Sequence, residues 1–174
     1  NSLYGAILNP GCRFFDKRIG QSTTLTGRTI VKHMSAEANK VITGTYDHVG
    51  DAMIYGDTDS CYFSAWPTLK DDVESGKIEW NTEKAIVLYD QVADAVDSTF
   101  VVMMAKQFHC PKSRATVIAA GREIVAQSGL FITKKRYAAL VVDNEGFRTD
   151  IDGKAGKVKA MGLDLRRSDT PVFM

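Results

Sequence analysis

Two stretches of the chain place apolar residues at helical spacing. Residues 26–42 follow this pattern, and Gly44 comes directly after it as a residue that commonly ends a helix. A second apolar face runs through residues 82–108, with Asn81 or Thr82 in position to cap its first turn. We therefore predict two long helices, of which the second is the longest helix in the chain.

The remaining apolar runs are short and rich in β-branched and aromatic residues, as β-strands usually are. In residues 52–65, the runs AMIY and SCYFSA flank GDTD, where Gly56 allows the backbone torsions of a tight turn. This pattern predicts a β-hairpin. Further strands are predicted in ATVIAA, EIVAQ, LFIT and RYAALVVD, with DNEG as a turn into FRTD, whereas IDGKAGKVK is typical of a loop.

The order of these elements indicates the fold class. Strands and helices alternate without the regular spacing of a parallel sheet, so we predict an α+β fold, in which the two long helices pack on one face of an antiparallel sheet. At 174 residues, 44% hydrophobic and 25% charged, the chain is large enough for one domain with a core, or for a large piece of a bigger protein.

Composition also bears on location. No apolar run approaches the length of a membrane span, and the sequence shows no basic-then-apolar leader. The three cysteines are odd in number and far apart, which fits neither a disulfide framework nor a paired-cysteine zinc site. We therefore expect a cytoplasmic protein with reduced, buried thiols and no membrane partner.

Net charge is only +1, so the chain lacks the basic balance of a simple nucleic-acid-binding protein. Its charges are nevertheless segregated: aspartates crowd residues 47–59, and cations accumulate from Lys134 onward. Asp57 and Asp59 stand one residue apart. Like charges roughly 5 Å apart repel by about 1 kcal/mol in water, and a bound Mg²⁺ would remove this repulsion. Taken alone, the run fits a solvated turn better, since Asp and Gly are ordinary turn residues.

The run KKRY, residues 134–137, contains three consecutive cations. On a strand, Lys134 and Arg136 would share one face and Lys135 would point to the other, and burying any of them without an anionic partner is costly. Such a run is usually a solvated surface. Beside an acidic metal centre, however, a nucleic-acid phosphodiester is the simpler partner.

Four motifs stand in order along the chain: NSLYG, YGDTDS, KKRY and KAMGLDLRRSDTP. In order and approximate spacing they resemble the palm domain of family B (polymerase-alpha-like) DNA polymerases of the kind found in T-even-like bacteriophages. The resemblance covers nearly the whole chain, although residues 81–108 are matched by position only. It implies that residues 1–9 are the end of a fingers helix and the entry to the palm, and that residues 10–174 are palm up to the thumb junction.

The resemblance implies template-directed addition of deoxynucleotides to a primer 3′ end, with two divalent ions (Mg²⁺ or Mn²⁺) as cofactors. Its substrates would be primer-template DNA and deoxynucleoside triphosphates. Asp59 looks like the ligand of both catalytic ions, and Asp57 like a nearby acid of the same metal site with a less direct part. Thr58 would shape the turn beside the nucleotide.

Further roles are carried over from the family to matching positions. Asn1, Tyr4 and Gly5 match the edge of the nucleotide pocket; an alternative is that a helix ends here, with Tyr4 in the core and Gly5 as its C′ residue. Lys135 is the candidate for contact with base edges and Tyr137 for contact with the primer backbone. Including these two, the implied DNA contacts are Tyr55, Ser60, Lys134, Lys135, Arg136, Tyr137, Arg166 and Arg167.

Two carboxylates, Glu123 and Glu145, align with residues that lie near the active centre in relatives and would hold an accessory ion. Arg166 and Arg167 fit a surface turn equally well when each is considered alone.

Two elements of the family's active site are not in the sequence. These are an aspartate from an SLYP-type motif and a lysine one helical turn before the NSLYG asparagine. We therefore expect the chain to be inactive alone, to leave a sheet edge exposed, and to act with the N-terminal polymerase and exonuclease portion, the thumb and a sliding clamp.

Two other functions stay open. A metal-dependent glycosyltransferase could use the Asp-x-Asp at residues 57–59 to hold a sugar nucleotide. A non-catalytic palm-like module could bind DNA or a protein partner without metal chemistry.

Overall fold

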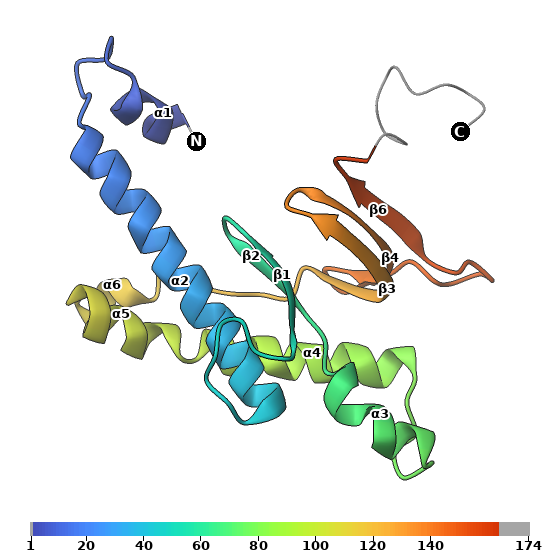
Figure 1. Ribbon diagram of the computed structural model, residues 1–174. Helices are drawn as coiled ribbons and strands as arrows, with labels where there is room; N and C mark the ends of the chain where they lie inside the picture. The colour runs from blue at the N-terminus through green and yellow to red at the C-terminus, as the bar shows by residue number, and fades with distance from the viewer. Residues whose placement is uncertain (1, 164–174) are drawn as a thin grey trace, which may run out of the picture.

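The computed structural model describes residues 2–163 as a mixed helical and antiparallel β structure (Figure 1). The helices are α1 (Ser2–Leu8), α2 (Lys17–Thr43), α3 (Trp66–Glu74), α4 (Thr82–Asp97), α5 (Phe100–Phe108) and α6 (Lys112–Ala115). The strands are β1 (Met53–Asp57), β2 (Ser60–Phe63), β3 (Ile124–Thr133), β4 (Arg136–Asn144), β5 (Phe147–Arg148) and β6 (Lys157–Met161). The predicted α+β class is confirmed.

Helix α2 confirms the first predicted helix and extends it toward the N-terminus. The carboxylate of Asp16 caps its first turn by accepting a hydrogen bond from the amide of Arg18 at 2.8 Å. At its other end Gly44 adopts a left-handed conformation, with φ of 82°, and donates its amide to the carbonyl of Lys40. With 27 residues, α2 is the longest helix of the described chain.

The second predicted helix is interrupted, so the prediction that it is the longest is wrong. It begins as expected, with Asn81 accepting a hydrogen bond from the amide of Lys84, but it divides into α4 and α5 at Ser98 and Thr99. Both hydroxyls donate to carbonyls three residues earlier, at 2.7 Å. Such local bonds compete with the helical ladder, which explains the break.

The core lies where α2 crosses the layer formed by α4 and α5 (Figure 1). Its buried members are Ala38, Val92, Val96, Phe100 and Met103. Side chains of the β1–β2 hairpin, among them Met53 and Phe63, pack against this core. The helices therefore support that hairpin through apolar contacts.

The strands form two antiparallel sheets within the described residues, rather than one. Strands β1 and β2 pair only with each other, while β4 pairs with β3 on one side and with β5 and β6 on the other. Sequence ATVIAA is not a strand, EIVAQ and LFIT belong to the single strand β3, and the predicted loop IDGKAGKVK runs into β6. Helix α2 packs on the β1–β2 hairpin and α4 on β3.

Residues 2–163 contain no helix with both the length and the hydropathy needed to cross a bilayer. The thiols of Cys12, Cys61 and Cys110 are free and partly buried.

Candidate functional site

The first part of the site is the acidic tip, the end of the β1–β2 hairpin formed by residues 57–60. Asp57 pairs with Ser60, and Thr58 and Asp59 make the two-residue loop between them. Gly56 lies within β1 and does not adopt a left-handed conformation, so the expectation that it forms the turn is wrong. The hairpin itself is confirmed.

The two carboxylates of the acidic tip have different surroundings. Asp57 accepts hydrogen bonds from the amide of Thr58 at 2.8 Å and from its hydroxyl at 3.1 Å, while the Tyr55 hydroxyl lies at 3.5 Å. The backbone bond is the main cause that lowers the pKa of Asp57, and the charges of Lys135 and Lys134 add to it. Asp59 is exposed and, among residues 2–163, forms neither a hydrogen bond nor an ion pair. It therefore keeps its oxygens available for a ligand.

The second part is the basic tip, residues 133–136 at the end of the β3–β4 hairpin. Thr133 pairs with Arg136, and Lys134 and Lys135 form the turn, with Lys135 at φ of 62°. The expectation that these cations alternate between the faces of a strand is therefore wrong. Because a hairpin turn projects from the sheet, all three cations are exposed.

Four aromatic residues, which we call the aromatic cluster, join the two hairpins. Tyr55 and Tyr62 come from the first, and Phe131 and Tyr137 from the second, with ring centroids 5.2 to 5.9 Å apart. The hydroxyls of Tyr62 and Tyr137 are 2.9 Å apart, and the amide of Lys135 donates to the Tyr55 hydroxyl at 2.8 Å. The acidic and basic tips consequently lie side by side (Figure 1).

The end of β6 supports the basic tip from its other side. The Arg136 side chain donates from Nε to the carbonyl of Gly162 at 3.2 Å. A Cβ at Gly162 would lie only 2.1 Å from the carbonyl oxygen of Lys135, and the residue has φ of 64°. Glycine in the KAMG motif is therefore needed for close packing on the basic tip.

A cleft of about 590 Å³ opens beside the acidic tip, between α2, α4 and strand β3. Asp59 and Glu123 both line it. However, Glu123 forms an ion pair with Lys159 at 2.6 Å, and the only described link to Glu145 is a backbone bond from the amide of Glu145 to the carbonyl of Glu123. The described part of the chain contains no group of three His, Cys, Asp or Glu residues that could hold a metal.

The acidic tip fits a particular kind of metal site. Mg²⁺ binds to one or two carboxylates and fills its other positions with water and substrate phosphates. Asp59 supplies one such carboxylate, exposed at the cleft, whereas Asp57 already accepts bonds within its own turn. The tip therefore fits Mg²⁺ that arrives with a phosphate-bearing substrate.

The predicted nucleotide-edge residues belong to helix α1 or precede it. Tyr4 and Gly5 both lie within α1, and the Tyr4 hydroxyl is 2.9 Å from the hydroxyl of Thr24 on α2. Tyr4 is 40% exposed, so the alternative with Gly5 at the helix end and Tyr4 in the core is wrong. Asn1 lies outside the described residues, as do Arg166 and Arg167.

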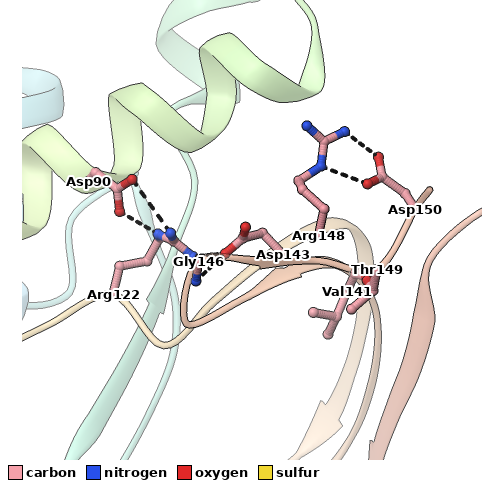
Figure 2. A network of polar contacts seen from close by, with 8 residues as sticks. All are labelled: Asp90, Arg122, Val141, Asp143, Gly146, Arg148, Thr149 and Asp150. Atoms are coloured by element: carbon pink, nitrogen blue, oxygen red, sulfur yellow. Dashed lines mark hydrogen bonds and ion pairs between the residues drawn. The ribbon is translucent and has the colours of Figure 1, made fainter.

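Sequence reasoning missed a charged network that ties α4 to the four-stranded sheet (Figure 2). The guanidinium of Arg122 bonds to Asp90 at 2.5 Å and to the buried carboxylate of Asp143, which also accepts the amide of Gly146 at 3.0 Å. Burial lowers the pKa of Arg122, but the two carboxylates outweigh it, so the group stays charged. In the sequence, the sign of this network is Asp143, an aspartate directly after the apolar run AALVV.

No protein-family model matches the chain, but individual relatives do. The DNA-directed DNA polymerase of Escherichia phage RB69 is 31% identical over 181 residues, which cover 98% of this chain and 19% of that protein. The DNA-directed DNA polymerase of Enterobacteria phage T4 is 26% identical over 188 residues, covering 98% of this chain and 20% of that protein. DNA polymerase II of Escherichia coli strain K12 is 36% identical over 62 residues, or 36% of this chain and 7% of that protein.

The chain thus spans about a fifth of the length of its two phage relatives. These relatives confirm the resemblance to family B DNA polymerases of T-even-like bacteriophages.

Proposed function

We propose that this chain, a homologue of family B DNA polymerases, is the palm segment in which the primer end meets the catalytic metal ions. The observation that carries the proposal is the placement of the two tips. The exposed carboxylate of Asp59 projects from one hairpin, and three exposed cations project from the neighbouring hairpin. A nucleic-acid strand held by its phosphates at the basic tip would therefore lie beside a carboxylate suited to Mg²⁺.

Each tip has a distinct part in this function. When bound, two divalent ions would supply activation of the primer 3′-hydroxyl and neutralise charge on the triphosphate and the leaving pyrophosphate. Asp59 would hold these ions, and Asp57 and Thr58 stabilise the turn that presents Asp59. Lys134, Lys135 and Arg136 bind the primer strand.

Other assignments depend on the family resemblance. Asn1, Tyr4 and Gly5 would border the nucleotide, Ser60 and Tyr55 would approach the DNA, and Arg166 and Arg167 would contact the duplex toward the thumb. Glu123 and Glu145 would serve an accessory ion only after Glu123 leaves Lys159. The partners would be primer-template DNA, deoxynucleoside triphosphates and the remaining polymerase, exonuclease and thumb segments, with a sliding clamp bound elsewhere. The place of action would be the cytoplasm of the host cell.

Neither alternative function is favoured. The three relatives are DNA polymerases by name, and a glycosyltransferase would leave the basic tip without a role. A non-catalytic DNA-binding module predicts that Asp59 is dispensable, which the following experiment tests.

The decisive experiment replaces the aligned segment of the phage RB69 polymerase by this chain and measures primer extension. Asp59→Asn should lower the rate by about 100-fold or more, because it weakens binding of the metal ions whose positive charge would stabilise the transition state. The matched control is Asp51→Asn, which neutralises an exposed aspartate before β1 and should leave the rate unchanged. Equal rates with and without the Asp59 carboxylate would contradict the metal role. The chain alone should not extend a primer.

A further inference from the structure

We propose that Tyr62 and Tyr137 are positioning residues, whose paired hydroxyls set the spacing between the acidic and basic tips and thus the position of a primer end relative to Asp59. This inference rests on the proposed function and adds to it how the relative position of the two tips is fixed.

The relative position of the two sheets must be fixed by contacts other than strand pairing. Within residues 2–163, β1 and β2 share no strand pairing with β3 to β6. The relative placement of the tips is therefore left to side chains. The contacts that bridge the hairpins near the tips are those of the aromatic cluster and the bond from Lys135 to Tyr55.

The cluster is built from two cross-strand pairs that meet. Tyr62 pairs with Tyr55 across the first hairpin, and Tyr137 pairs with Phe131 across the second. Tyr62 lies two positions after Ser60, and Tyr137 directly follows Arg136, so each hydroxyl-bearing residue is close to one tip. A shift between Tyr62 and Tyr137 would therefore move one tip past the other.

Strand β3 is adapted to receive this arrangement. A Cβ at Gly129 would lie 2.7 Å from the Phe131 ring, so glycine leaves the space in which that ring lies. Phe131 in turn stacks on both Tyr55 and Tyr137. Aromatic pairs are favourable over a range of centroid distances, about 4.5–7 Å, so ring contacts alone do not fix the spacing between the hairpins.

The hydroxyl pair removes this freedom. Tyr137 is only 3% exposed. Burial, followed by the hydrogen bond to Tyr137, raises the pKa of Tyr62, so the Tyr62 hydroxyl stays protonated at neutral pH. A buried hydroxyl without a partner is costly, and each of these is the partner of the other at 2.9 Å. Since a hydrogen bond weakens steeply with distance and angle, the pair favours one relative position of the hairpins.

Iron-directed cleavage can measure that position directly. Fe²⁺ replaces Mg²⁺ in the complex of the full chain with a labelled primer annealed to a longer template, and ascorbate with hydrogen peroxide produces radicals that cut the nearest sugars. We expect wild-type cleavage to be concentrated at the primer terminus. Tyr62→Phe and Tyr137→Phe should both spread the cuts to nucleotides on either side. Tyr62 is not among the predicted DNA contacts, so Tyr62→Phe should do this with unchanged DNA affinity and total cleavage.

Three comparisons make the result specific. The double variant should spread the cuts no further than either single variant, because both remove the same bond. Tyr89→Phe is the matched control, since its hydroxyl accepts the amide of Ala65 outside the aromatic cluster, and it should leave the pattern unchanged. Asp59→Asn should abolish the cleavage.

The outcomes separate the two proposals. Cleavage that is absent in the wild type, or that persists in Asp59→Asn, would overturn the proposed function. Cleavage that depends on Asp59 but keeps the wild-type pattern in Tyr62→Phe and Tyr137→Phe would overturn the positioning role alone. An equal spread in Tyr89→Phe, or a parallel fall in melting temperature and total cleavage without a change of pattern, would reduce that role to general stability.

Discussion

Two groups of charged side chains in this protein differ in their partners: one group is paired within the fold, and the other faces outward. In the network of Arg122, Asp90 and Asp143, each charge meets an opposite charge from another part of the chain. At the acidic and basic tips, Asp59 and the three cations face outward, and the described residues give Asp59 no partner. The network uses its charges to hold α4 on the sheet, whereas the tips keep theirs available for ligands.

This difference has an energetic consequence that mutations can test. Removing one member of a buried ion pair leaves an uncompensated charge and costs about 3–5 kcal/mol. Neutralising an exposed charge usually changes stability by less than about 0.5 kcal/mol. Substitutions of the same chemical kind should therefore give large stability effects in the network and small ones at the tips.

The largest effect is expected for Arg122→Met. It leaves the carboxylate of Asp143 buried without its cation, so the free energy of unfolding should fall by about 3–5 kcal/mol in urea denaturation. Adding Asp143→Asn should recover part of the loss, because the unpaired charge is then gone. The control is Arg18→Met, which breaks an exposed pair with Asp16 and should lower the free energy of unfolding far less than Arg122→Met does. Equal losses of unfolding free energy in Arg122→Met and Arg18→Met would contradict the expectation that the network stabilises the fold more than exposed charges do.

The sequence carries enough information to predict the acidic hairpin, but not to predict the turn at the basic tip or the network. The acidic hairpin and helix α2 follow from local patterns, such as alternating strands around a turn and a capping glycine. Arg122 meets Asp90 and Asp143 across 32 and 21 residues, and no periodicity marks such partners. The Tyr62–Tyr137 bond spans 75 residues, so only a resemblance to known proteins could suggest that the two tips meet. Lys134 and Lys135 were misplaced because a strand and a tight turn look alike when the run is short.

An intermediate effect is expected at His33, a buried residue whose partners are uncharged. Its ring nitrogens lie 2.9 Å from the Tyr46 hydroxyl and 2.8 Å from that of Thr99. Burial lowers the pKa of His33 below its ordinary value of 6.5, although nearby Glu37 opposes the shift. As pH falls below about 6.5, the unfolded chain takes up the proton first, so stability decreases until the pH passes the lower pKa of the folded state.

Urea denaturation between pH 5 and 7.5 would measure this loss. His33→Gln should flatten the pH dependence, whereas His48→Gln, at a half-exposed histidine, should keep it. If His33→Gln leaves the pH dependence of stability unchanged, protonation of His33 does not control stability in acid. The comparison between internal charges and the exposed charges of the tips would then rest on the Arg122 network alone.

The smallest effect on stability is expected for Lys135→Gln at the basic tip, although the change should be clear in binding. The side chain is exposed, and the amide that bonds to Tyr55 is retained, so the free energy of unfolding should change by less than about 0.5 kcal/mol. If Lys135 neutralises one phosphate, the slope of log affinity for primer-template DNA against log salt should become shallower by about 1. Lys32→Gln, an exposed lysine on α2, should leave that slope unchanged. A stability loss in Lys135→Gln approaching that of Arg122→Met would mean that the basic tip belongs to the internal framework, because its charge would then be satisfied within the fold.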